Sequence, residues 1–257
     1  MKKSLEILTT GPFTVEQITV AYTGHIPPPP DIARRVNMRW TDFVAEARRD
    51  GRTLFNAPVA CLKSRSTAAG ILRLELAQTD YKTFLVTTLR DRAWFEVNSP
   101  AAMTPALGNS ILLTHADTAY LGVRSNQVAA YPHWAHLFGG VLDWPKRWSS
   151  NGDVLLEHLY KELEEELGLD SHDLTAPPQV LGLMRDPVLA QPELVWHGEL
   201  KQPLVQRCDA LNVQEHDTIL AVPIAAAPVA GPPVTPVTPV SFAAIRMVPR
   251  LKDNGIL

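Results

Sequence analysis

The chain has 257 residues, of which 46% are hydrophobic and 20% are charged, and its formal net charge is −3. This length suits one large domain or two small ones, and the composition excludes a wholly disordered chain, a collagen and a disulfide scaffold. A weakly acidic chain lacks the basic excess of most nucleic-acid-binding proteins, so we expect no nucleic-acid partner.

Cysteine usage and hydrophobicity favour a soluble protein of the cytoplasm. Cys61 and Cys208 are the two cysteines and lie far apart, which suits a reducing compartment. No apolar run reaches the ~18–20 residues that a membrane span needs, and no apolar signal core follows Lys2 and Lys3. We therefore expect a cytoplasmic protein with no membrane partner, while the sequence leaves its oligomeric state open.

The first part of the chain predicts a long helix after a run of prolines. Residues 27–30 are four consecutive prolines, which predict an extended segment. In residues 31–50, hydrophobic side chains recur at helical spacing, Asp31 is a suitable N-cap and Gly51 is a suitable stop. A helix is therefore expected over residues 31–50.

Strands and a joint are predicted between this helix and residue 105. Residues 72–77 alternate leucine with charged residues, which is a strand pattern, and residues 52–63 are a candidate hairpin or sheet partner. The prolines at the end of this region, Pro100 and Pro105, mark a joint. We expect residues 1–105 to form a small α+β module and residues 106–257 to form a second domain.

The second domain predicts several strands and one strong helix, over residues 153–167. A second proline cluster, residues 223–239, predicts a stiff linker rather than a helix. Strands, one helix and further strands favour an α+β layered domain over a repeated βαβ array. The strands are expected as a strand–turn–strand unit over residues 110–124, followed by residues 179–185, 193–200 and 219–223.

The predicted helix 153–167 carries an acidic face. Leucines every four residues give it an apolar face, while Glu162, Glu165 and Glu166 lie together on another face. Like charges at this spacing cost a few tenths of a kcal/mol per pair, and a divalent cation such as Mg²⁺, which prefers carboxylate oxygens, would remove that cost. The alternative is a solvated acidic face, which is common on protein surfaces.

Two adjacent glycines, Gly139 and Gly140, lie upstream of this helix and follow a loop that contains Tyr131, His133, Trp134 and His136. Glycine lets the backbone approach a metal or a phosphate closely, and its carbonyl can add a hard ligand. Gly140 is therefore a candidate contributor to a metal site.

The glycines and the acidic helix together resemble the Nudix box, which reads Gly, five residues, Glu, seven residues, Arg-Glu, an apolar residue, any residue, Glu-Glu, any residue, Gly and an apolar residue. Residues 161–169 fit its second half, with Lys161 in place of Arg. Asp153 stands in place of the first Glu, and Gly140 fits as the opening Gly only if residues 143–152 carry an insertion.

The resemblance to Nudix hydrolases implies an α/β/α sandwich with a mixed sheet in residues 106–257, and Mg²⁺-dependent hydrolysis of the diphosphate of a nucleoside diphosphate-linked substrate. It implies that Glu162, Glu165 and Glu166, with the Gly140 carbonyl, hold Mg²⁺, with Mn²⁺ as an alternative ion. Lys161 would act with them, as a cation that orients or balances the carboxylates but lacks the bidentate fork of Arg.

A finer resemblance covers residues 52–58, 72–76 and 81–85, which look like the N-terminal region of an animal Nudix branch with a lengthened box that hydrolyses UDP-glucose and UDP-galactose. It implies a nucleotide-sugar substrate and the products UMP and sugar 1-phosphate. Two alternatives stay open: a Nudix hydrolase of another nucleotide (ADP-ribose, a dinucleotide or a nucleoside triphosphate), or a non-catalytic Nudix-derived nucleotide sensor.

Further side chains are candidates for the chemistry and for substrate binding. Arg124 and Arg185 end predicted strands and could contact phosphate, while Tyr131 and Trp144 could stack on a base or line a sugar pocket. An ordinary ion pair or core packing is the alternative for each of them. The candidate general bases are Glu193, Glu199, Glu215 and Asp217, and residues 215–217 are the preferred source of an extra acid.

Overall fold

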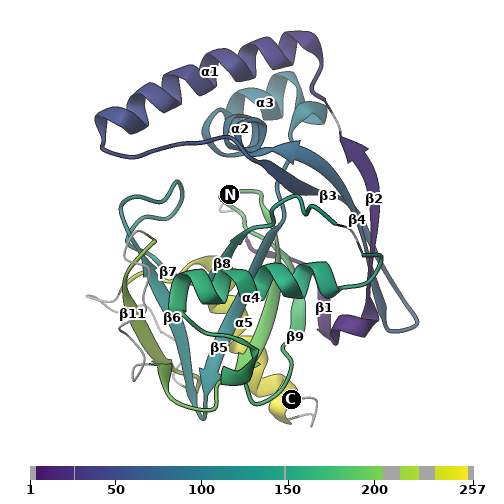
Figure 1. The fold of residues 1–257 in the computed structure, drawn as a ribbon, viewed down its shortest axis with the longest axis vertical. Coiled ribbons are helices and arrows are strands. Elements are labelled where there is room, and N and C mark those ends of the chain that lie inside the picture. Colours follow the sequence, from purple (N-terminus) through teal and green to yellow (C-terminus); the bar gives the residue numbers. More distant parts are fainter. Residues whose placement is uncertain (1–3, 26, 148, 205–214, 226–234, 254–257) are drawn as a thin grey trace.

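The computed structural model describes residues 4–25, 27–147, 149–204, 215–225 and 235–253 (Figure 1). Its main element is an eight-stranded mixed sheet whose central order is β1-β9-β10-β5-β6-β11, with β7 paired to β6 and β8 paired to β5. β10 runs parallel to β5, and the other pairs are antiparallel. The strands are β1 (Glu6–Phe13), β5 (Gly108–His115), β6 (Thr118–Arg124), β7 (Ala135–His136), β8 (Phe138–Val141), β9 (Gln179–Arg185), β10 (Pro192–Glu199) and β11 (His216–Pro223).

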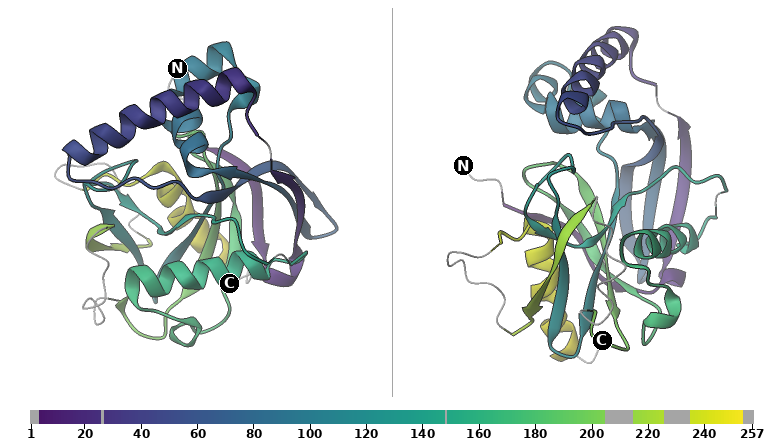
Figure 2. Two further views of the ribbon diagram at one scale, coloured as in Figure 1. Left: turned by 45° about the horizontal axis from the view of Figure 1, so that its top comes forward. Right: turned by 60° about the vertical axis from the view of Figure 1, so that its left-hand side comes forward.

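Two helices cover opposite faces of this sheet, α4 (Asp153–Leu167) on one side and α5 (Pro239–Asp253) on the other (Figure 2). The leucines of α4 join a core cluster that includes Trp196 of β10. The apolar side chains of α5 join a second cluster with Leu121 of β6 and Val195 of β10. The predicted α+β class and the mixed-sheet sandwich are therefore confirmed.

A second, three-stranded sheet lies beside the sandwich, with the order β2-β4-β3. It is built from β2 (Ile18–His25), β3 (Pro58–Ala68) and β4 (Ile71–Asp80). Above it lie the helices α1 (Pro30–Arg49), α2 (Tyr81–Phe84) and α3 (Arg92–Asn98), as Figure 1 shows. A π-helical segment (Leu85–Arg90) and short 3₁₀ turns (Val15–Gln17, Pro100–Ala102 and Ser171–Asp173) complete the described elements.

The predicted elements of the N-terminal region are largely confirmed, but the start of α1 differs from the prediction. Pro29 occupies the N-cap, so Asp31 lies in the first turn and the extended proline run ends at Pro29. Proline fits the first helical position because its fixed φ suits the helix and its missing N–H would have no partner there. The predicted strand 72–77 is part of β4. Its predicted partner, residues 52–63, overlaps β3, which pairs with β4 antiparallel.

One strand of the N-terminal region belongs to the large sheet, because β1 pairs with β9. The division of the chain after residue 105 stays a prediction.

Helix α5 was not expected, since Pro239 opens it and Pro249 lies inside it, and an internal proline usually argues against a helix. Of the predicted linker 223–239, residues 226–234 lie outside the described residues, as does Cys208.

Among the described residues, no helix is both long and apolar enough to cross a lipid bilayer.

Candidate metal centre

The last turns of α4 bring two glutamates to one face of the helix. Leu159 and Leu163 are buried in the main core, and this packing turns Glu162 and Glu166 together toward β8, which α4 contacts. Gly168 ends the helix in a left-handed conformation, with φ of 65°, which glycine adopts readily.

Two glycines of β8 make room for these carboxylates. The amide of Gly139 donates a hydrogen bond of 3.0 Å to Oε2 of Glu166. A Cβ on Gly140 would lie 2.7 Å from Oε2 of Glu162, so a larger residue would push that carboxylate away. Gly139 has φ of +123°, which side-chain-bearing residues rarely adopt. These glycines therefore allow the close backbone approach that was expected, and the groups that the backbone approaches are the two carboxylates.

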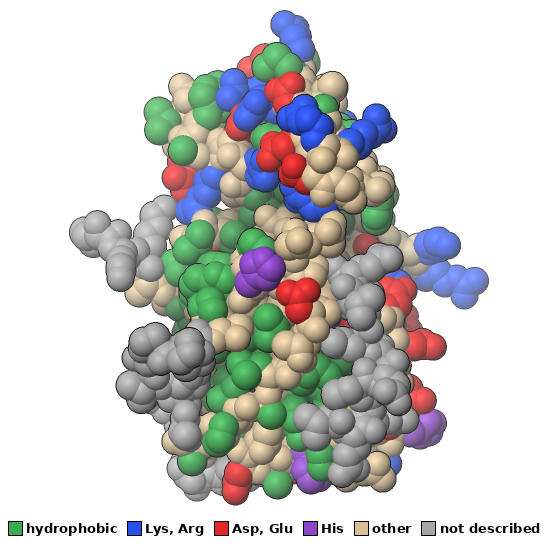
Figure 3. Space-filling model, turned by 90° about the vertical axis from the view of Figure 1, so that its left-hand side faces the viewer, with side chains coloured by type: hydrophobic (Ala, Val, Ile, Leu, Met, Phe, Trp, Pro, Cys, Tyr) green, Lys and Arg blue, Asp and Glu red, His purple; other side chains and the backbone are tan. Residues whose placement is uncertain are grey.

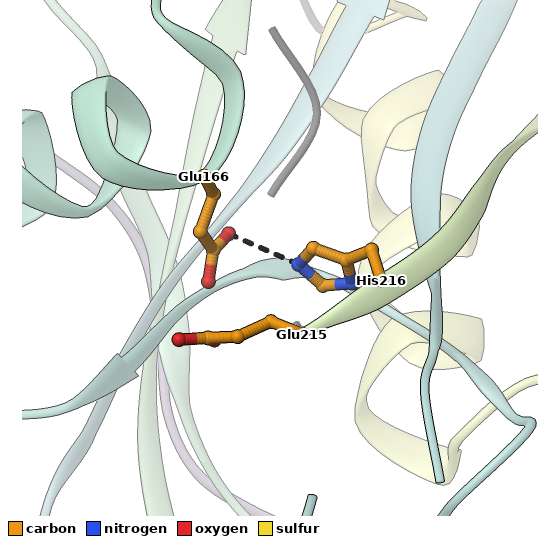
Figure 4. Close-up of side chains that lie close together, drawn as sticks. All are labelled: Glu166, Glu215 and His216. Carbon is orange, nitrogen blue, oxygen red and sulfur yellow. Dashed lines mark ion pairs between the residues drawn. The ribbon is translucent and has the colours of Figure 1, made fainter. Parts of the chain in front are cut away.

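A third carboxylate and an imidazole come from the start of β11. Glu215 and His216 each place a potential ligand atom near Glu166, and these atoms all lie within 4.8 Å of one another (Figure 4). Nε2 of His216 is 3.3 Å from Oε2 of Glu166. Glu215 belongs to the segment that the sequence favours as the source of an extra acid.

Two carboxylates of the cluster formed by Glu162, Glu166, Glu215 and His216 have a raised pKa, because of burial and of neighbouring negative charge. Burial, followed by the negative charge of Glu166, raises the pKa of Glu162 to about 8. Glu166 is only 1% exposed, and burial together with the neighbouring Glu215 raises its pKa well above the usual range. Each shift reflects the free-energy cost of holding negative charge at a buried position among other carboxylates. The cluster therefore has less positive charge than its carboxylates need for balance.

Arg124, at the end of β6, is a cation whose charge interacts with Glu166 and Glu215 of this cluster. The register of β11 against β6 pairs it with His216. Burial lowers the pKa of Arg124, while the charges of Glu166, Glu193 and Glu215 oppose that shift. Its Nε has no hydrogen-bond partner in the described part of the chain. One guanidinium therefore faces several carboxylates.

The donor atoms of the cluster fit a divalent cation. Oε1 of Glu166 and both ring nitrogens of His216 are buried and have no hydrogen-bond partner among the described residues. Buried polar atoms are usually paired, and carboxylate oxygens with an imidazole nitrogen are common ligands of divalent metals. A cation would satisfy these atoms and balance the carboxylates.

Lys161 and Glu165 lie toward the solvent side of α4. Nζ of Lys161 is 3.1 Å from Asp143 and 3.7 Å from both Glu162 and Glu165. The Glu165 side chain is 57% exposed. Its predicted role as a ligand, and that of the Gly140 carbonyl, stay predictions.

Other predicted site residues make contacts of their own. Tyr131 donates hydrogen bonds of 3.0 and 2.9 Å to the carboxylate of Asp186, and its ring lies 5.1 Å from that of Trp134. Trp144 packs edge-on against Tyr22 at 6.0 Å. Arg185 forms an ion pair with Glu6 at 3.0 Å. No contact described for Trp144 or Arg185 joins either side chain to the cluster.

The candidate bases separate into different environments. Glu193 is buried and its Oε1 lies 3.2 Å from Nε2 of His136; burial alone would raise the pKa of Glu193, but His136 and Ser110 lower it. Asp217 lies 3.4 Å from Nδ1 of His133. The carbonyl of Glu199 accepts a hydrogen bond from the amide of Thr175. Of these candidates, Glu215 is the one grouped with Glu166.

Two histidines near the carboxylates were not predicted as site residues. Nε2 of His158 is 3.5 Å from Oε1 of Glu162, one turn away on α4, and burial lowers the pKa of His158 to about 4. The i,i+4 spacing of His158 and Glu162 was visible in the sequence. The position of His216 depends on the pairing of β11 with β6, which no local pattern reveals.

Comparisons with known proteins give a loose structural likeness. No family model matches the chain, and no curated protein matches its sequence. Solved structures similar to the chain include the MutT NUDIX hydrolase from Burkholderia pseudomallei (17% identity, 56% of this chain and 98% of that chain, TM-score 0.40). Another is the NUDIX domain of Shewanella oneidensis NrtR complexed with ADP ribose (15%, 63% and 98%, 0.43). A third is a MutT/nudix family protein from Enterococcus faecalis (14%, 63% and 73%, 0.40). At these identities and TM-scores the likeness does not establish a family.

Glu162→Gln should change how the stability of the metal-free protein depends on pH. Because the folded-state pKa of Glu162 is raised to about 8, against about 4.3 for an unfolded chain, the wild type loses stability as pH rises between these values. We expect the variant to gain roughly 1–3 kcal/mol over the wild type near pH 8 and little near pH 4.5. Urea unfolding in the presence of a chelator measures this difference.

The control for this measurement is Glu164→Gln, which makes the same change at an exposed position of α4. It should follow the wild-type pH profile. Parallel profiles for Glu162→Gln and the wild type would contradict the electrostatic account of the cluster.

Proposed function

We propose that the chain is a metal-dependent hydrolase of the Nudix type that cleaves the diphosphate of a nucleoside diphosphate-linked substrate. The observation that carries this proposal is the grouping of Glu215 and His216 with the buried Glu166, beside Glu162, whose pKa the charges of Glu166 and Glu215 help to raise. The box resemblance of residues 161–169 supports the same reading, since it points to the same helix.

Each residue of the cluster has a role in this chemistry. Glu166, oriented by the Gly139 amide, would hold the ion together with Glu162 and Glu215. When bound, a divalent cation supplies charge neutralisation at the phosphoryl oxygens and a lowered pKa of bound water. Glu215 is the exposed carboxylate of the cluster, so we assign one of its oxygens to the ion and the other as the acceptor of the proton from the attacking water.

Arg124 supplies positive charge beside the carboxylates. Its guanidinium interacts with Glu166 and Glu215, and arginine binds phosphate oxygens through two parallel hydrogen bonds. We infer that Arg124 contacts the diphosphate and fixes it for attack. Water would add to one phosphorus, the bridging P–O bond would break, and the leaving phosphate would take the electron pair.

A cavity of about 380 Å³ offers space for the rest of the substrate. It lies between the N-terminal region and the loop after β6, with Arg52, Arg90 and Gln127 among its lining residues. Figure 3 shows basic side chains over the N-terminal helices at the top of the molecule.

The substrate that we propose is a UDP-sugar, which would give UMP and sugar 1-phosphate. Its support is the similarity of residues 52–58, 72–76 and 81–85 to the branch that hydrolyses UDP-glucose and UDP-galactose, and the presence of Arg52 in the cavity lining. Other nucleotides, and a sensor that binds without cleavage, are outcomes that the same experiment separates.

Purified protein should cleave a UDP-sugar in a panel that also contains ADP-ribose, NADH and nucleoside triphosphates, with Mg²⁺ or Mn²⁺ present. Glu166→Gln should lower kcat at least ~100-fold with an unchanged circular dichroism spectrum, because it removes a central ligand. Separation of the phosphate-containing products measures both effects.

The matched control is Glu164→Gln on the solvent face of the same helix, which should keep wild-type turnover. Cleavage of a different nucleotide alone would replace the substrate assignment. Binding of nucleotide without any cleavage would favour the sensor, and equal turnover by wild type and Glu166→Gln would reject the catalytic role of the cluster.

Arg52→Ala tests the participation of the N-terminal region. Because Arg52 lines the cavity but is not grouped with the carboxylates, its loss should raise KM about tenfold and leave kcat within a factor of about two. Steady-state kinetics on the cleaved nucleotide give both constants. Arg73→Ala, at an exposed position of β4, is the control, and identical KM values for the two variants would place the substrate elsewhere.

A further inference from the structure

The imidazole of His216 is buried beside the carboxylates without a hydrogen bond of its own. Its side chain is 3% exposed, and neither ring nitrogen has a hydrogen-bond partner among the residues described. Nε2 lies 3.3 Å from Oε2 of Glu166. Burying a polar ring in this way costs free energy unless something else pairs with it.

Neighbouring residues hold the ring in this place. Phe138 of β8 packs edge-on against it, with ring centroids 5.4 Å apart. Gly122 of β6 makes room for it, since a Cβ there would lie 2.3 Å from Nδ1 of His216. The imidazole is therefore fixed in the site by the sheet, and Nε2 is directed at Glu166 (Figure 4).

We propose that Nε2 of His216 is a metal ligand, together with carboxylate oxygens of Glu166 and Glu215, and that this mixed nitrogen–oxygen site prefers a divalent transition ion to Mg²⁺. The inference rests on the metal site of the proposed function and names the ion class that it takes. Mg²⁺ is held by oxygen ligands, whereas imidazole nitrogen suits transition ions such as Co²⁺, Ni²⁺ and Zn²⁺.

The spacing of the donor atoms allows such a site. The ligand atoms of Glu166, Glu215 and His216 lie within 4.8 Å of one another. Two ligands that are each about 2.1 Å from an ion lie at most about 4.2 Å apart. Three donors around one ion lie closer still, about 3.0–3.6 Å apart, so side-chain movements of about an ångström would bring all three to one ion.

Pulsed electron paramagnetic resonance of the wild-type protein loaded with Mn²⁺ tests the nitrogen ligand directly. We expect modulation from a directly coordinated ¹⁴N nucleus in the wild type and its loss in His216→Asn, which keeps a similar volume. Wild-type modulation without any ¹⁴N contribution would overturn the proposal, and this readout needs neither a variant nor activity.

Isothermal titration with Co²⁺ and with Mg²⁺ tests the preference. We expect the wild type to bind Co²⁺ at least ~100-fold more tightly than Mg²⁺, and His216→Asn to lose at least ~10-fold in Co²⁺ affinity while its Mg²⁺ affinity changes little. His172→Asn, at an exposed position after α4, is the control. An unchanged Co²⁺ to Mg²⁺ ratio in His216→Asn would contradict the proposal.

These outcomes separate the two proposals. Nitrogen coordination in a protein that cleaves no nucleotide would leave the metal site in place and remove the proposed hydrolase activity. Efficient cleavage with Mg²⁺, without nitrogen coordination of Mn²⁺, would keep the hydrolase and remove the role of His216.

Discussion

The crowding of three carboxylates, of which Glu166 is buried and Glu215 is exposed, is the constraint on which the rest of the site depends. Glu162 and Glu166 are placed there by the packing of α4 on the sheet, and Glu215 is placed there by the start of β11. Their mutual repulsion and burial raise the pKa of Glu162 to about 8. A fold keeps such an arrangement most readily where a cation offsets its cost.

The surrounding structure fits this interpretation because each neighbouring element leaves room for the cluster or adds to it. Gly139 gives an amide hydrogen bond to Glu166, and Gly140 leaves space for Glu162. Gly122 leaves space for the ring of His216. Arg124 adds positive charge beside the carboxylates. In the N-terminal region, Arg52 lines a separate cavity.

Local sequence patterns predicted part of the sandwich, including the strand–turn–strand unit in which β5 pairs with β6. The predicted helix over residues 153–167 is confirmed with the same bounds. By contrast, β1 pairs with β9, about 170 residues later in the chain, and α5 contains a proline that argues locally against a helix. The sequence also favoured residues 215–217 as a source of an acid. It could not place His216 against Glu166, because that contact depends on the register of β11 against β6.

The most direct measurement of the central claim is anomalous diffraction from crystals grown with Mn²⁺ and a non-hydrolysable UDP-sugar analogue. The account predicts an anomalous peak in contact with the carboxylates of Glu166 and Glu215, with the diphosphate of the analogue bound to the ion beside Arg124. A nucleotide bound elsewhere, with no peak at the cluster and its glutamates turned to solvent, would contradict it.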